Sequence, residues 1–187
     1  MKKTIFKGLV ILLSVFTLAS CSKSDEPVNN SDLIGEWNLT EFTYSGKTTS
    51  KISGQTITTD FEGVGKNFSS KLTFSQNPNK VSASGSHDID LTYKLFGLEQ
   101  TNTYTLKDIS SEATWTENGD KITFNGQVIK TSTPNTINLP QSNDSYEFTV
   151  ERLDENSIKL TNIINQKNTV NGATVKVELN TKIVLRR

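Results

Sequence analysis

The sequence contains very few of the side chains that proteins use for redox chemistry, metal binding and nucleophilic catalysis. Its 187 residues include one cysteine and one histidine. An intrachain disulfide needs a pair of cysteines, and structural zinc sites are built from several cysteine or histidine ligands. The composition therefore excludes an intrachain disulfide and predicts no metal site and no cofactor. Ordinary side-chain packing is left as the source of stability.

Long apolar runs are also scarce. The clearest one, Gly8–Phe16, is shorter than the roughly 20 residues that a membrane-spanning helix requires. Three lysines precede this run and small residues follow it. That layout is typical of a secretory signal peptide, which we place at residues 1–20.

The predicted signal peptide leads into Leu18-Ala19-Ser20-Cys21. This segment resembles the lipobox of bacterial lipoproteins, at which signal peptidase II cleaves just before the cysteine. The resemblance implies acyl chains, such as palmitate, on Cys21 and attachment to a membrane. At roughly 0.8 kcal/mol per buried CH₂, two or three chains anchor a protein firmly. The alternative is an ordinary secretory signal with a free cysteine beside the cleavage site.

Residues 21–32 are polar and show no hydrophobic periodicity, which is typical of a flexible tether. Within them, Asp25-Glu26 resembles the export signal of surface-exposed lipoproteins in some Gram-negative bacteria. A solvated linker has the same composition. We therefore expect a lipid anchor in the outer membrane, and the choice between the periplasmic and the outer surface stays open.

The remaining chain is long enough for one domain, which we place at residues 33–187. Without residues 1–20 the chain has 187 − 20 = 167 residues, with 20 − 3 = 17 basic and 20 acidic side chains, a net charge of −3. No basic patch is visible. The sequence therefore predicts no nucleic-acid partner, and we expect a monomer.

Apolar and polar residues alternate along most of this domain. Ile89, Leu91, Tyr93 and Leu95 are separated by polar residues, and the same pattern recurs in residues 175–185. Such alternation indicates antiparallel strands with one buried face. Sequential hairpins of this kind form an up-and-down meander, and a long meander tends to close into a β-barrel because closure removes exposed edges. An open sandwich is the alternative.

Turn residues divide the predicted strands. Asn118-Gly119 and Asn171-Gly172 favour hairpins of type I′, in which both central residues have positive φ. Further turns are predicted at residues 77–79 and 154–156. Gly54, Gly63 and Gly65 interrupt the pattern within residues 46–68, so a strand pair, a long loop and a lid all remain open for this segment.

The domain opens with Gly35-Glu36-Trp37, and this Gly-x-Trp resembles the lipocalin and wider calycin pattern. More specifically, residues 33–187 are similar to the lipocalin-like lipoproteins of Bacteroidota. The resemblance implies a barrel whose tryptophan closes one end and packs against a basic residue from the last strand. Arg187 has the parity for this cation–π contact, and Arg186 is the fallback.

The alternation also predicts which side chains face the barrel interior. They line a cavity or form a dry core, and these alternatives stay open. The candidate cavity-lining residues are Leu39, Phe74, Tyr93, Trp115, Phe124 and Phe148, and the remaining inward residues include Leu72, Leu91, Leu160, Val177 and Leu179.

Candidates for catalysis are few. His87-Asp88 has the composition of a base and its orienting carboxylate, but a solvated loop or strand end fits the same residues. Asp88 and Asp90 share one face of a strand, which we expect to be the wet outer face, and we expect the same of Asp60 and Glu62. No nucleophile elbow is present. We therefore expect no enzyme and assign no catalytic residue.

Three functions follow from these features. The first is a lipid-anchored envelope protein with a lipocalin-like barrel that binds a small apolar or amphipathic ligand. The second is a non-enzymatic interaction module with a filled barrel, which contacts an envelope complex, a glycan or a host protein. The third and weakest is a hydrolase that uses His87.

Overall fold

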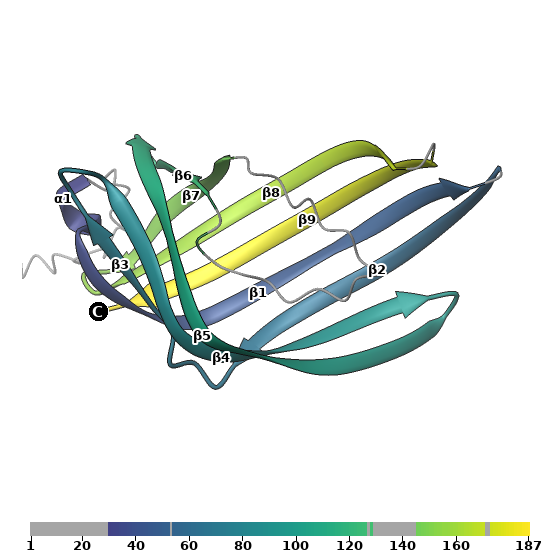
Figure 1. Cartoon of the computed structure of the whole chain (residues 1–187), viewed down its shortest axis with the longest axis horizontal. Helices are drawn as coiled ribbons and strands as arrows, with labels where there is room; N and C mark the ends of the chain where they lie inside the picture. Colours follow the sequence, from purple (N-terminus) through teal and green to yellow (C-terminus); the bar gives the residue numbers. More distant parts are fainter. Residues whose placement is uncertain (1–29, 53, 127, 129–144, 171–172) are drawn as a thin grey trace, which may run out of the picture.

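The computed structural model describes residues 30–52, 54–126, 128, 145–170 and 173–187. Within them, one short helix precedes nine strands (Figure 1). The elements are α1 (Asn30–Leu33), β1 (Gly35–Ile52), β2 (Gln55–Lys66), β3 (Lys71–Ser75), β4 (Lys80–Leu95), β5 (Leu98–Asn118), β6 (Lys121–Asn125), β7 (Ser145–Asp154), β8 (Ser157–Val170) and β9 (Ala173–Arg186). No helix in this part of the chain has the length and apolar character needed to cross a membrane.

All strand pairs are antiparallel and belong to a single sheet. The first strand also pairs with the last, because β1 is hydrogen-bonded to β9 over Asn38–Lys51. The hydrogen bonds therefore run in a ring, and the shape is barrel-like. The prediction of an all-β antiparallel meander is confirmed, and the two-sheet sandwich is excluded.

β2 and β3 together occupy one position in this ring. β1 pairs with β3 over Gly35–Asn38 and with β2 over Thr43–Ile52, and β4 likewise pairs with both. Residues 67–70 separate the two pieces. The end of the molecule that contains β3, β6 and β7 is thus a complete ring of eight strands, and we call it the closed end.

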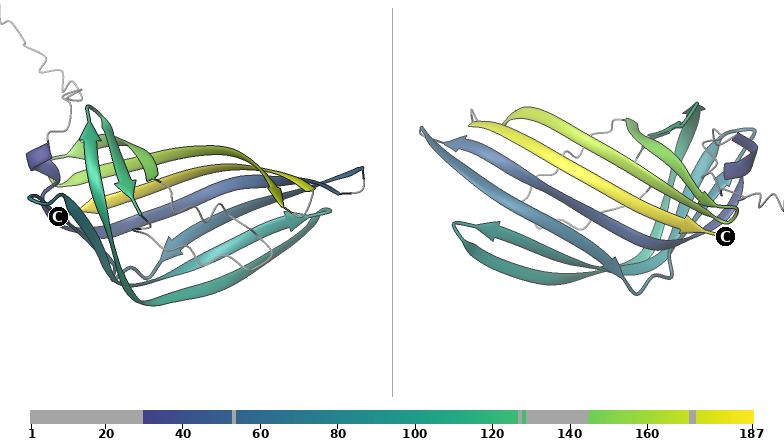
Figure 2. Two further views of the ribbon diagram at one scale, coloured as in Figure 1. Left: turned by 45° about the horizontal axis from the view of Figure 1, so that its top comes forward. Right: turned by 180° about the vertical axis from the view of Figure 1, so that it is seen from behind.

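The opposite half has fewer strands and a wider spread. We call residues 43–52, 55–66, 88–106, 162–170 and 173–181 the flared half; it consists of the hairpins β1–β2, β4–β5 and β8–β9 (Figures 1 and 2). Within β5 only Thr114–Asn118 pairs with β6, and within β8 only Ser157–Thr161 pairs with β7. Among the described residues, no strand covers the far edge of β5 or β8 in the flared half.

The core is concentrated at the closed end. Trp37, Leu72, Phe74, Trp115 and Ile122 are at most 1% exposed. Phe74 packs edge-to-face on Trp115, with ring centroids 5.9 Å apart, and lies 6.0 Å from Phe124. Large aromatic side chains at alternating positions of neighbouring strands therefore fill the interior of the closed end.

Most of the predicted turns lie where expected. Hairpin turns follow Ser75 and Asp154, but the turn between β5 and β6 differs in detail. Asn118 pairs with Lys121, so the two turn residues are Gly119 and Asp120, and only Gly119 has positive φ, at 62°. A glycine at the first central position is the type II′ arrangement, not the type I′ turn predicted. Asn171-Gly172 lies outside the described residues.

Residues 46–68 prove to be mainly a strand pair. They include the second half of β1 and all of β2, and Ile52 pairs with Gln55. The lid and long-loop alternatives are therefore wrong. The first described element also begins earlier than the predicted domain boundary, since α1 starts at Asn30, inside the segment assigned to the tether.

Candidate functional site

Five aromatic rings cross the interior where the closed end meets the flared half. We call Phe42, Tyr44, Phe61, Phe68 and His87 the aromatic belt. The ring of Phe42 lies 5.6 Å from that of Tyr44 and 5.9 Å from that of His87. Phe68 lies 5.7 Å from His87, and Phe61 lies 6.3 Å from Tyr44. The belt is therefore one contiguous layer of rings at the base of the flared half.

Two glycines of β2 make room for this belt. A Cβ on Gly63 would lie 2.2 Å from the ring of Tyr44, and one on Gly65 would lie 2.6 Å from the ring of Phe68. Neither distance is compatible with a real side chain. Gly63 and Gly65 therefore leave space for aromatic rings, because each ring packs against backbone that carries no side chain.

The belt carries two polar atoms that are buried without a hydrogen-bond partner in the described structure, Tyr44 Oη and His87 Nε2. The other ring nitrogen of His87, Nδ1, is 2.8 Å from the hydroxyl of Ser70, which is also buried. Native proteins seldom leave such groups unpaired, because each costs about 1–3 kcal/mol. The belt therefore has unused hydrogen-bonding capacity.

Burial changes the titration of both groups. It raises the pKa of Tyr44 to about 12, with a smaller contribution from the nearby Tyr104. It lowers the pKa of His87 against the opposing effect of Asp88. At neutral pH the belt therefore presents a neutral phenol and a neutral imidazole.

Above the belt, several inward apolar side chains are only partly buried, although Val177 on β9 is 1% exposed. Tyr93, Tyr104, Leu106, Val175 and Leu179 pack against the core while staying partly exposed. They alternate with outward polar residues and come from β4, β5 and β9. We call these five residues the apolar wall; an apolar wall beside two polar atoms without partners is suited to an amphipathic molecule.

The predicted cavity residues fall into two groups. Leu39, Phe74, Trp115, Phe124 and Phe148 are buried in the closed end, where Phe124 and Phe148 pack with centroids 5.5 Å apart. They fill the ring with their own side chains. Tyr93 alone lies in the flared half, where its hydroxyl donates to Oε1 of Gln100 at 2.7 Å.

The structure brings Gly35, Trp37 and Arg187 together at the closed end. The guanidinium carbon of Arg187 lies 4.2 Å from the centroid of the Trp37 ring, and Trp37 Nε1 donates to the carbonyl of Leu33 at 2.8 Å. Gly35 has a φ of 120°, which glycine adopts without strain. Arg187 also donates to the carbonyls of Asp32 and Ile34, at 2.5 and 2.8 Å. These hydrogen bonds attach α1 and the residue after it to the C-terminal residue at the closed end.

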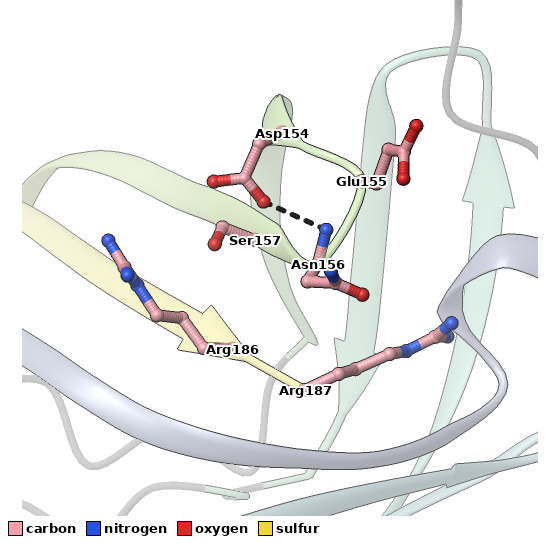
Figure 3. Close-up of a pocket in the computed structure, with 6 residues that line it drawn as sticks. All are labelled: Asp154, Glu155, Asn156, Ser157, Arg186 and Arg187. Atoms are coloured by element: carbon pink, nitrogen blue, oxygen red, sulfur yellow. Dashed lines mark hydrogen bonds between the residues drawn. The ribbon is translucent and has the colours of Figure 1, made fainter.

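The fallback residue, Arg186, points elsewhere. With Arg187 it borders a surface pocket of about 460 Å³ beside the β7–β8 turn, lined also by Asp154, Glu155, Asn156 and Ser157. Figure 3 shows the two arginine side chains extending away from each other, while Asp154 accepts a hydrogen bond from the Asn156 amide. The basic groups do not converge on one ligand, so we assign no site here.

His87 lies neither in a solvated loop nor at a strand end, contrary to one of the expectations. It is 2% exposed, within β4, and faces the interior. Asp88 faces outward, where it accepts a hydrogen bond from Asn67 at 2.6 Å, so the two residues are not brought together as a base and its orienter. The sequence pattern does not predict the apolar environment of His87, because its neighbours in the sequence are polar.

The acidic pairs lie on the outer face of the sheet. Asp90 pairs with Lys66 at 2.7 Å, and its pKa is lowered by hydrogen bonds from Lys66 and Thr103. Asp60 and Glu62 are exposed on β2. In the part of the chain that the structure describes, no group of three or more His, Cys, Asp or Glu side chains is arranged to hold a metal ion.

One carboxyl group at the closed end is buried instead. Glu117 follows Trp115 on the inner face of β5, and neither of its side-chain oxygens has a hydrogen-bond partner among the described residues. Burial raises its pKa, and the charge of Asp32 raises it further. Asp32 itself pairs with Arg152 at 2.9 Å.

The chain was compared with known protein families, curated proteins and solved structures, and none of them matches it significantly. The lipocalin-like resemblance therefore stays a prediction. Cys21 lies outside the described residues.

Sequence reasoning missed the aromatic belt. Phe61, Gly63 and Gly65 have the same parity, and Phe42 and Tyr44 alternate in the same way on the neighbouring strand. Glycines facing aromatic residues across a strand pair are the pattern that would have identified it. The glycines were interpreted only as interruptions.

Proposed function

We propose that the protein is a lipid-anchored protein of the outer membrane whose lipocalin-like domain binds a small amphipathic molecule in the flared half. The observation that carries the proposal is the combination of a partly exposed apolar wall with Tyr44 Oη and His87 Nε2, two buried polar atoms without partners in the described structure. The apolar part of the ligand lies against the wall. Its polar end accepts a hydrogen bond from Tyr44 Oη and forms a second hydrogen bond with His87 Nε2.

The proposal includes no catalytic step. His87 is held by Ser70, and no carboxylate among its immediate neighbours in β4 shares the interior with it, because Asp88 and Asp90 face outward. A group in this setting binds and orients a ligand. The alternative function, an interaction module with a filled barrel, is favoured by the dense packing of the closed end, and its outcome is part of the test below.

Ligand binding is tested by native mass spectrometry of the chain beginning at Ser22, which contains all described strands and lacks Cys21. The probes are palmitate and lysophosphatidylethanolamine. We expect a one-to-one adduct with at least one of them. A folded protein that binds neither probe, nor any component of an envelope lipid extract, would favour the filled-barrel module instead.

Substitutions in the flared half test whether the ligand binds there. Leu179→Asn should weaken it by about tenfold, the effect of a poorly buried apolar side chain. Ile163→Asn is the matched control, because Ile163 is 73% exposed on the outer face of the adjacent strand. Tyr44→Phe should weaken the adduct by about fivefold without lowering stability. Equal effects of Leu179→Asn and Ile163→Asn would place the ligand elsewhere.

The anchor is tested separately by labelling cells with radioactive palmitate. The wild-type protein should be labelled and fractionate with the outer membrane, whereas Cys21→Ser should lose both properties. Protease treatment of intact cells then reports whether the domain is on the outer surface. An unlabelled wild-type protein would contradict the lipid anchor without affecting the ligand site.

A further inference from the structure

The hairpin formed by β4 and β5 ends in an apolar tip, Leu95-Phe96-Gly97-Leu98. Phe96 is 77% exposed and Leu98 is 78% exposed. Leu95 pairs with Leu98, so Phe96 and Gly97 are the two turn residues. Figure 1 shows this tip at the opposite end of the molecule from α1. The most exposed apolar side chains of the described structure thus project from one of its longest hairpins.

The backbone makes the choice of Phe96 more unusual. Its φ is 51°, and the other described non-glycine residues with positive φ are Asn67, Asn77 and Asp108. Asparagine and aspartate tolerate this conformation, whereas a bulky aromatic residue is an outlier there. A two-residue hairpin turn of this type strongly prefers Asn-Gly. Phe96 is therefore both exposed and in a backbone conformation that aromatic residues disfavour, and an outlier of this kind points to function.

The tip is continuous with the interior of the flared half. Along the inner face of β4, Ile89 and Leu91 are buried, and Tyr93 and Leu95 are partly exposed. Leu98 extends the same face beyond Leu95 through their cross-strand pairing. One apolar track, with exposure increasing outward, therefore links the core to the tip.

The chemistry of the tip fits a lipid bilayer better than a protein partner. The four tip residues carry no charge, and Lys94 and Glu99, which flank them, pair with each other at 2.7 Å. A stable protein interface buries about 800 Å² on each partner and needs matched shape. A two-stranded tip is narrow, and insertion into hydrocarbon requires no such match.

We propose that the tip of the β4–β5 hairpin inserts into a phospholipid bilayer and that the ligand of the flared half passes between that bilayer and the interior along the apolar track. The second part rests on the proposed function, whereas insertion of the tip stands without it. The contact uses other residues than the predicted anchor at Cys21, and the tip lies at the opposite end of the molecule from α1.

Insertion is tested by co-flotation of the chain beginning at Ser22 with vesicles of phosphatidylethanolamine and phosphatidylglycerol. The wild-type domain should float with the vesicles. Phe96→Asn should reduce the bound fraction by about tenfold, and Leu98→Thr by a similar factor. Because Phe96→Asn creates the preferred Asn-Gly turn, it removes the apolar side chain without endangering the fold.

Ile163→Asn again provides the control, because it removes an equally exposed apolar side chain far from the tip, and it should float like the wild type. A wild-type domain that stays with the protein fraction, or a Phe96→Asn variant that floats unchanged, would overturn insertion. So would a photocrosslinker at position 96 that captures only protein in cells. Phe96→Asn should still bind palmitate in solution, so a failed insertion and a failed ligand site give different results.

Discussion

The closed end and the flared half are built from the same long strands, yet inward side chains are mostly buried at the closed end and become partly exposed toward the far end of the flared half. β1, β4, β5, β8 and β9 run through both, with the same alternation of inward and outward residues. At the closed end the inward positions carry Trp37, Phe74 and Trp115, all at most 1% exposed. In the flared half the inward positions of β1 carry Thr48 and Ser50, which are half-buried.

The difference shows that alternation alone does not decide whether a sheet encloses a core. The short strands β3, β6 and β7 complete the ring at one end, and large rings fill the space they enclose. Beyond β6 and β7, the described residues leave one edge each of β5 and β8 unpaired, and inward side chains stay in contact with solvent. Dense packing and solvent access are thereby found at different ends of one sheet.

The largest expected effect comes from emptying the closed end. Trp37→Ala should lower the free energy of unfolding by about 3–5 kcal/mol, because it leaves a cavity and removes the contacts to Arg187 and to the Leu33 carbonyl. Tyr93→Ala, in the flared half, should cost at most about 1 kcal/mol. Urea unfolding of both variants measures the difference, and equal losses would contradict the division between the two ends.

An intermediate effect is expected at the belt. Gly63→Ala should cost about 1–3 kcal/mol, because the new Cβ collides with the ring of Tyr44. The cost should largely disappear when Tyr44 is replaced by alanine as well, and a double-mutant cycle measures this coupling. Additive losses from the two substitutions would show that Gly63 serves some purpose other than seating the ring.

The smallest effects are two opposite dependences of stability on pH. The raised pKa of Glu117 means that the native state holds more protons than the unfolded state above about pH 4.5, the ordinary value, until the folded pKa is passed. This contribution to stability is therefore lost as pH rises. Glu117→Gln should abolish the loss and stabilise the protein at neutral pH.

His87 at the belt has the opposite sign. Its lowered pKa means that the unfolded state binds more protons than the native state below about pH 6.5, so stability falls as pH falls through this range. His87→Gln should lack that fall. Urea unfolding across pH 4–8 separates the two ends, and parallel profiles for both variants would show that one of the two groups is solvated.

The strands and their inner faces were predictable because each depends on local alternation. Trp37, Leu91, Phe124 and Ile183 all face the core as their parity requires. The contact of Arg187 with Trp37 was expected from the resemblance together with parity. In both cases neighbours in the sequence carry the information.

The belt was not predictable in the same way because its contacts cross strands. Gly63 has meaning only opposite Tyr44, and His87 only beside Ser70, and each pair is set by register. The limits of the ring depend on how long β6 and β7 are relative to their neighbours, which a turn signal does not reveal. Even the β5–β6 turn shifted by one residue, because Gly119 alone supplies the required φ.

The position of Arg187 has a mechanical consequence. Its guanidinium donates hydrogen bonds to two carbonyls, one in α1 and one just before β1. Arg152 forms an ion pair with the carboxylate of Asp32. If the chain is anchored through Cys21, any pull on the domain enters at Asn30 and reaches these contacts before it reaches the sheet. The pulling force is then distributed over α1, Arg187 and β7. The backbone hydrogen bonds of β1 are therefore not broken one after another.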